Sequence, residues 1–110
     1  MNSRTYTTPC AGFEWDTQKA ESNLEKHKIS FEVSTEIFNG YPLSFEDQRE
    51  YGEVRTVVIG DLGGVVVYVV CTVREPRIRI ISARKASKEE REAYNEHIQR
   101  TTISDPSKDE

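Results

Sequence analysis

Apolar and polar positions along this chain predict a helical N-terminal part followed by a strand-rich middle. Alternating aromatic residues predict a short strand over 13–16. Asp16 then caps a helix over about 17–28, because its carboxylate can accept the open amide hydrogens of the first turn. Ser30 is a second N-cap, and the apolar stripe behind it predicts a helix over 31–39. One face of the first helix carries Lys19, Asn23 and Lys26.

The middle of the chain has the pattern of consecutive strands. Residues 42–47 predict an edge strand and residues 54–61 a clear second strand. The Gly-Gly pair at 63–64 suits the tight turn of a hairpin. Residues 65–73 are almost continuously apolar, so we expect a central strand that is covered on both faces. A fourth strand of this series follows at 77–83.

Two local signals complete the pattern. The alternation of the last strand breaks at Ile80 and Ile81, which predicts a β-bulge there. Ser87 with Glu90 forms a capping box that opens a helix over 88–100. The order β-α-α-β-β-β-β-α predicts an α+β fold, with two N-terminal helices and one C-terminal helix against an antiparallel sheet of about four to five strands.

Composition places this pattern in one small domain. The chain has 110 residues and a net charge of -4, and we expect a single domain over 13–100 between flexible tails at 1–12 and 101–110. Two cysteines do not make a disulfide framework, and Cys71 is expected to be a buried thiol, so a cytoplasmic location is expected. No apolar run is long enough to span a membrane, so no membrane partner is expected.

The charge distribution is uneven. Between Arg74 and Arg91 the chain carries seven positive and three negative residues, although the whole chain is acidic. A basic patch on an acidic background favours a phosphate-rich partner. Basic residues on strand edges also serve solubility and deter edge-to-edge pairing, so both interpretations stay open at this point.

The sequence lacks the signatures of several catalytic classes. It has two histidines, 70 residues apart, and no Cys-x-x-Cys pair, so we expect neither a metal nor another cofactor. It also lacks a Gly-rich phosphate loop and a Gly-x-Ser-x-Gly elbow. Arginine, histidine and tyrosine side chains can cleave RNA without a metal, because they can bind phosphate and transfer the protons of a 2′-hydroxyl attack.

Spaced motifs from about Phe13 to Tyr94 resemble the BrnT family of toxins. They are FEWD at 13–16, then Lys19-Ala20, Asn23, Lys26-His27 and Phe31-Glu32, then Arg55, Ile59-Gly60, Thr72-x-Arg74, RIISARKA at 79–86, Glu90-Arg91 and Tyr94. The sequence departs from the family pattern at Cys71, where members usually carry an aromatic residue or a histidine.

The resemblance implies a metal-independent endoribonuclease of a type II toxin–antitoxin pair, with a fold related to the RelE toxins. It implies RNA as the substrate and a BrnA-type antitoxin as the partner, with DNA reached only through the antitoxin. The alternative is a binding module without activity, a degenerate toxin fold that acts as co-repressor of a DNA-binding protein.

The candidate site residues follow from the motifs. The catalytic candidates are Arg74, Arg79, Arg84, His27 and Tyr94. The substrate-binding candidates are Lys26, Arg55, Thr72 and Lys85. His27 is equally suited to stabilise the C-terminal end of its helix. We expect the surface of Arg74, Arg79 and Arg84 to bind both RNA and antitoxin, with the face of the first two helices around Leu24, Phe31 and Ile37 as the second choice for the antitoxin.

Overall fold

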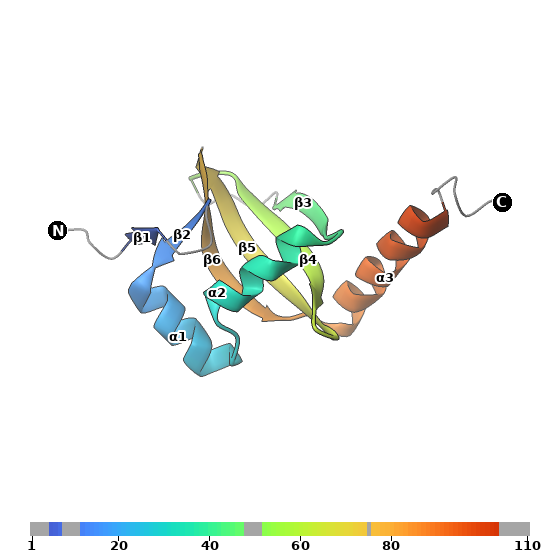
Figure 1. Cartoon of the computed structure of the whole chain (residues 1–110), viewed down its shortest axis with the longest axis horizontal. Coiled ribbons are helices and arrows are strands. Elements are labelled where there is room, and N and C mark those ends of the chain that lie inside the picture. The colour runs from blue at the N-terminus through green and yellow to red at the C-terminus, as the bar shows by residue number, and fades with distance from the viewer. Residues whose placement is uncertain (1–4, 8–11, 48–51, 75, 104–110) are drawn as a thin grey trace.

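The computed structural model describes residues 5–7, 12–47, 52–74 and 76–103. Its elements are β1 Thr5–Thr7, β2 Phe13–Asp16, α1 Thr17–His27, α2 Phe31–Ser34, the 3-10 helix η1 Thr35–Asn39, β3 Leu43–Asp47, β4 Arg55–Leu62, β5 Val65–Arg74, β6 Arg77–Lys85 and α3 Lys88–Ile103. The strands form one sheet in the order β1-β2-β6-β5-β4-β3, in which the three-residue β1 extends one edge. The α+β fold predicted from the sequence is therefore confirmed (Figure 1).

The prediction of an antiparallel sheet was wrong, because the sheet is mixed. Strand β2 pairs with β6 in the parallel direction, through Phe13 opposite Ile78 and Glu14 opposite Arg79. The pairs β3–β4, β4–β5 and β5–β6 are antiparallel. Short turns force consecutive strands to run antiparallel, but β2 and β6 are separated by most of the chain. No local signal therefore fixes the direction in which β2 joins the sheet.

The first two helices begin where their caps predict. Asp16 Oδ1 accepts the backbone amides of Gln18 at 2.8 Å and Lys19 at 3.2 Å. Ser30 Oγ accepts the amide of Val33 at 3.0 Å. The helix predicted over 31–39 divides into α2 and the 3-10 helix η1. At the junction, the Ser34 hydroxyl donates to a main-chain carbonyl at 2.7 Å, a local bond that competes with the regular helical ladder.

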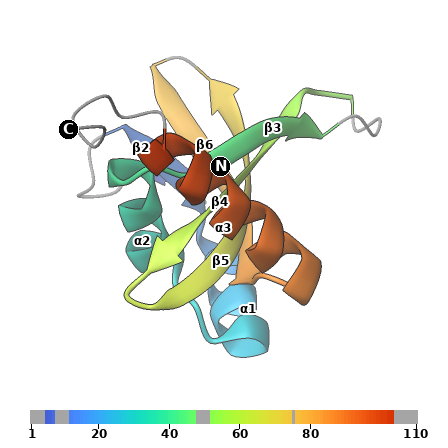
Figure 2. The same cartoon turned by 90° about the vertical axis from the view of Figure 1, so that its right-hand side faces the viewer.

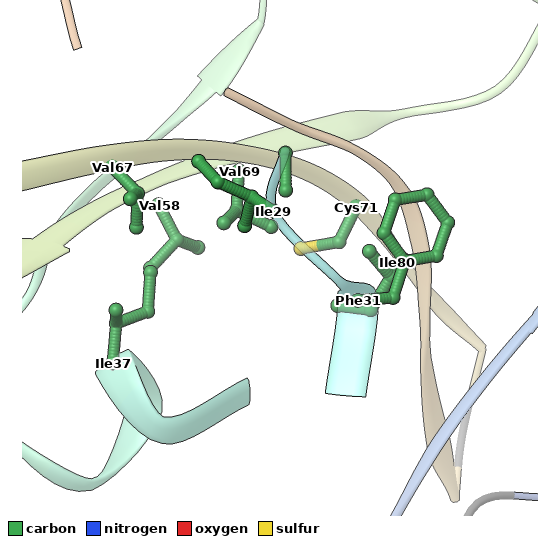
Figure 3. Close-up of a cluster of buried hydrophobic side chains, with 9 residues drawn as sticks. Ile29, Phe31, Ile37, Val58, Val67, Val69, Cys71 and Ile80 are labelled. Carbon is green, nitrogen blue, oxygen red and sulfur yellow. The ribbon is translucent and has the colours of Figure 1, made fainter. Parts of the chain in front are cut away.

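The hydrophobic core lies between the sheet and the helices α1, α2 and η1. Ile37 points from η1 towards the buried valines of β4 and β5, and Phe31 of α2 lies beside Cys71 and Ile80, as Figure 3 shows. Gly60 lets η1 approach β4 closely, because a Cβ atom at this position would lie 2.7 Å from the Cβ atom of Ile37. Cys71 is buried in the same core, as predicted, and burial raises its pKa to about 11.

The opposite side of the sheet, which we call the second face, carries most of the predicted site residues. A β-bulge in β6 brings Arg84 to this face as well: Ile80 pairs with Cys71 and Ser82 pairs with Val70, so that Ile81 is the extra residue. The predicted bulge is confirmed. The strand register then places on the second face Arg55, Val57 and Ile59 of β4, Tyr68, Val70, Thr72 and Arg74 of β5, and Arg77, Arg79, Ser82 and Arg84 of β6.

Helix α3 begins with the predicted capping box and extends away from the sheet (Figures 1 and 2). The Ser87 amide donates to the Glu90 carboxylate at 2.8 Å, and the Glu90 amide donates to Ser87 Oγ at 3.2 Å. Of the tails predicted at 1–12 and 101–110, residues 1–4, 8–11 and 104–110 lie outside the described residues.

Candidate RNA-binding face and a basic pocket beside it

A polar row crosses the second face near the tip of the β5–β6 hairpin. Asp47 of β3 pairs with Arg55 of β4, and Thr72 of β5 pairs with Arg79 of β6. Arg55 lies level with Thr72, since the next residue of β4 pairs with Cys71. Glu14 of β2 completes the row opposite Arg79. One row across the sheet therefore has an arginine on each side of Thr72 and an acidic residue at each end, with three of the predicted residues at its centre.

Three arginines of this face are already paired with carboxylates. Glu53 lies 3.4 Å from Arg74 and 3.7 Å from Arg55, and Glu14 lies 3.3 Å from Arg79. The excess of positive charge between positions 74 and 91 is therefore reduced in the folded chain, because distant segments bring acidic residues to the same surface. These pairs are partly exposed, so they exchange readily with water and with other anions.

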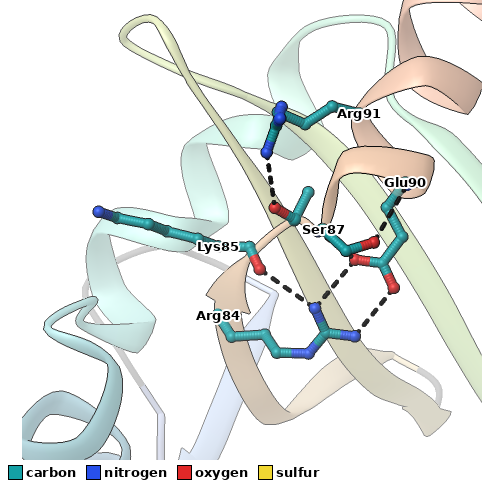
Figure 4. A network of polar contacts seen from close by, with 6 residues as sticks. Arg84, Lys85, Ser87, Glu90 and Arg91 are labelled. Atoms are coloured by element: carbon teal, nitrogen blue, oxygen red, sulfur yellow. Dashed lines mark hydrogen bonds and ion pairs between the residues drawn. The ribbon is translucent and has the colours of Figure 1, made fainter.

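Arg84 is the most tightly held of the candidates. Its two guanidinium nitrogens, Nη1 and Nη2, each donate to the Glu90 carboxylate at 2.9 Å, as Figure 4 shows. The guanidinium also lies 3.9 Å above the centre of the Tyr68 ring. The hydrogen bonds to Glu90 raise the pKa of Arg84, and those from Arg84 lower the pKa of Glu90. Arg84 thus joins the end of β6 to the first turn of α3.

Arg79 and Arg84 share a face but lie apart. Their partners on β5, Thr72 and Tyr68, are four residues apart, which is about 13 Å at roughly 3.3 Å per residue. Arg74 lies beyond Thr72, at the hairpin tip. The expected single surface of Arg74, Arg79 and Arg84 is thus divided into a hairpin end and an α3 end.

The remaining candidates on the sheet and on α3 have different surroundings. The Thr72 hydroxyl donates to the Val54 carbonyl at 2.7 Å, so it fixes the chain before β4. The Tyr94 hydroxyl lies near Asp61, and burial raises the pKa of Tyr94. Lys85 pairs with Val67, which places it on the helix-covered side of the sheet, away from the arginines. Cys71 also points to the core, so the departure from the family pattern lies away from the second face.

Lys26 and His27 line a pocket at the edge of the second face. The pocket has a volume of about 210 Å³ and is lined by Lys19, Ser22, Asn23, Lys26, His27, Ile81 and Ser82. Ser82 also belongs to the second face, so the pocket borders the strand that carries Arg79 and Arg84. Both basic residues also lie in the last turn of α1, where positive charge stabilises the helix end.

Sequence reasoning assigned no role to several residues of this site. Glu14 and Glu53 pair with the arginines from β2 and from the segment before β4, so only the fold could reveal them. Arg77 faces Arg74 across the β5–β6 pair, which the short turn between them could have indicated. Lys19 shares a helical face with Lys26, and that spacing is visible in the sequence.

The alternative antitoxin surface is smaller than predicted. Phe31 and Ile37 are 1 % and 2 % exposed, so both belong to the core and are unavailable to a partner. Leu24 is 48 % exposed and remains on the surface of α1. The prediction was wrong for the two core residues because the apolar stripe of the second helix faces the sheet.

Two further properties bear on function. Within the ranges that the structure describes, no three His, Cys, Asp or Glu side chains come together in the way a metal ion needs. A search of the same residues for a helix of sufficient length and apolar character to cross the bilayer found none.

A mixed sheet with arginines from three strands on one face, and a basic pocket at its edge, defines a protein suited to bind a polyanion. The family model of BrnT, the ribonuclease toxin of type II toxin–antitoxin systems, matches residues 15–90, and the chain belongs to this family. The family resemblance seen in the sequence is thereby confirmed, and the family implies an RNA target and an antitoxin partner. A search of the curated proteins found no match.

Proposed function

We propose that this chain is a metal-independent endoribonuclease toxin that binds RNA on the second face and cleaves it by attack of the 2′-hydroxyl. The observation that carries the proposal is the register of β4, β5 and β6, which brings Arg55, Arg74 and Arg79 to the same end of one face. The bulge adds Arg84 to the other end of this face, because Arg79 and Arg84 are five positions apart and a regular strand would point them to opposite faces. The family to which the chain belongs supports ribonuclease activity.

The reaction needs alignment, charge neutralisation and proton transfer. The 2′-oxygen forms a bond to phosphorus and loses its proton, the bond from phosphorus to the 5′-oxygen breaks, and that oxygen takes up a proton. The products are a 2′,3′-cyclic phosphate and a 5′-hydroxyl. Arginine suits the growing phosphoryl charge because its planar fork can bind two oxygens at once. No metal is required by this scheme, and the sparse histidines and cysteines of the chain support that part of the proposal.

The hairpin end of the second face is the proposed centre of the reaction. Arg55, Arg74 and Arg79 lie there together, and RNA phosphate replaces Glu53 and Glu14 as their partner. His27 lies in the pocket beside Ser82, next to this strand, and is the proposed proton carrier because an imidazole can both accept and donate a proton.

The partner we propose is a BrnA-type antitoxin that covers the second face. An acidic segment of such a protein can bind to the same arginines as the RNA phosphates, so binding of the antitoxin and binding of RNA exclude each other. DNA is then reached only through the antitoxin. A fold related to the RelE toxins and a cytoplasmic location are parts of the same proposal.

A binding module without activity is the alternative. The ion pairs of the arginines favour it, because such pairs are equally suited to a structural role. A glutamate already pairs with each of Arg55, Arg74, Arg79 and Arg84. In that case the chain binds an antitoxin and takes part in repression without cleaving RNA.

Cleavage of RNA by the purified chain decides between the two. We expect growth arrest on expression alone, relief by the antitoxin, and cleavage in excess EDTA with cyclic or 3′-phosphate ends. Arg79→Ala should lower the rate about 100- to 1000-fold, because one preorganised charge at a transition state is worth roughly 2.7 to 4 kcal/mol. Arg100→Ala, on the exposed part of α3, is the control. Normal growth with soluble protein and intact RNA would favour the binding module.

A further inference from the structure

The pocket between α1 and β6 has the composition of an anion site. Its lining includes the lysines Lys19 and Lys26 and the serines Ser22 and Ser82, and none of the described residues that line it carries a carboxylate. Four arginines of the second face, in contrast, each have a glutamate within 4 Å, namely Arg55, Arg74, Arg79 and Arg84. The described wall of the pocket therefore brings positive charge together without an acidic side chain beside it.

The pocket is built by a fixed contact between the helix and the strand. The Asn23 amide donates to the Ala83 carbonyl at 2.8 Å and to the Ile29 carbonyl at 3.0 Å, and its oxygen accepts the Ala83 amide at 3.1 Å. Asn23 thus takes the place of a neighbouring strand at the outer edge of β6. It is buried and fully bonded, so it holds α1 in place and leaves ligand binding to its neighbours.

Helical spacing places both lysines on the side of α1 that lines the pocket. Lys19 lies four residues before Asn23, and Lys26 lies three residues after it, so all three share one face of α1. The β-bulge supplies the opposite wall, where Ile81 is the extra residue and Ser82 follows it. Two lysines and two serines therefore line one cavity.

The size of the cavity limits what it can hold. Its volume of about 210 Å³ is below the roughly 300 to 1,000 Å³ that is usual for sites of drug-sized ligands. A single phosphate group is small, needs several donors and matches two positive charges. A whole nucleotide with its base would exceed the space.

We propose that this pocket binds one backbone phosphate of the RNA strand, next to the phosphate that reacts on the second face. The inference rests on the proposed function, because the RNA must lie on the second face for a neighbouring phosphate to reach Ser82. Lys19 and Lys26 supply the charge, and the Ser22 and Ser82 hydroxyls donate hydrogen bonds. The pocket thereby fixes the direction and register of the strand relative to Arg79.

The first test uses inorganic phosphate and amide NMR signals of the full chain. We expect saturable shifts at Ser22, Ile81 and Ser82 in the wild type and their loss in the Lys19→Gln, Lys26→Gln double variant. A matched control is Lys88→Gln, Arg100→Gln, which removes the same charge from α3 and should keep the shifts. Wild-type protein without shifts at these amides would overturn the site, whatever its activity.

The second test uses a 2′-O-methyl RNA oligonucleotide, which lacks the nucleophile and so reports binding alone. Loss of one phosphate contact should lower the slope of log affinity against log salt by about 0.7 in the Lys19→Gln, Lys26→Gln variant and leave it unchanged in the control. If the wild type cleaves RNA and the double variant has the same slope as the wild type, the phosphate site in the pocket is refuted and the proposed function is retained. Phosphate shifts in the pocket, without any RNA cleavage, would keep an anion site and refute the proposed function.

Discussion

The ion pair between Arg84 and Glu90 offers a sharp test, because it connects the sheet to α3. Glu90→Gln removes the charge but keeps an amide that still fits the capping box with Ser87. Arg84→Ala removes the same pair and, in addition, the contact with the Tyr68 ring. The two single variants and the double variant form a cycle that isolates the pair from its surroundings.

The magnitude follows from geometry and exposure. The side chains of Arg84 and Glu90 are 37 % and 24 % exposed, so water screens part of the attraction. Exposed pairs contribute about 0.2 to 1 kcal/mol, and the two parallel hydrogen bonds place this one near the upper end. The contact of Arg84 with the partly buried Tyr68 ring adds about 0.5 to 1 kcal/mol, the range for cation–π contacts that water still reaches. We expect Arg84→Ala to cost about 1.5 to 2 kcal/mol, more than an ordinary surface charge, and the coupling of the pair to be about 1 kcal/mol.

The pair also predicts how stability depends on pH. The hydrogen bonds from Arg84 lower the pKa of Glu90 in the folded state. The stabilisation is therefore complete above the unfolded value, about 4.3, and is lost as the pH falls through the lower folded value. Glu90→Gln should remove this part of the acid dependence, since glutamine does not titrate.

Urea unfolding at about pH 7 and about pH 3 measures both effects. At the neutral pH the cycle should give the coupling of about 1 kcal/mol, and at the acidic pH the wild type and Glu90→Gln should converge. A coupling near zero at neutral pH would refute the reasoning, and so would an equal loss of stability by the wild type and Glu90→Gln on acidification. Either result would show that the ion pair of Arg84 does not stabilise the fold.

Three further results are expected. Gly60→Ala should destabilise the fold by about 1 to 3 kcal/mol through its contact with Ile37, measured by urea unfolding, and wild-type stability would show that η1 can shift. The Cys71 thiol, with a pKa raised to about 11 by burial, should resist iodoacetamide until the chain unfolds, and rapid labelling of folded protein would contradict its burial. Antitoxin association should slow between about 50 and 500 mM salt and weaken in Arg74→Ala, Arg79→Ala, whereas unchanged binding would place the antitoxin elsewhere.

Local features of the fold could be read from the sequence because each depends on a few neighbouring residues. Asp16, Ser30 and the pair Ser87–Glu90 cap helices where predicted, since a cap needs only a side chain and the amides that follow it. The break in alternation at Ile80 and Ile81 identified the bulge. The apolar strand β5 lies inside the sheet, as expected, but the prediction that both of its faces are covered was wrong, because Val66, Tyr68 and Val70 on the second face are only partly buried.

The site depended on contacts that the sequence does not encode locally. The bulge was predicted, but only the register showed that it places Arg79 and Arg84 on one face. The glutamates that balance the arginines come from β2 and from the segment before β4, so a charge count along the chain could not include them.

The sequence by itself determined the family, the caps, the strands and the residue types that phosphate chemistry needs, because these are set by order and spacing. Only the tertiary structure decided the parallel entry of β2, the division of the arginines between two ends of the second face, and the pocket of Lys19 and Lys26. Each of these joins segments that are far apart in the chain. Loop closure between such segments costs free energy that many packing contacts together repay, so no short stretch of sequence specifies the outcome.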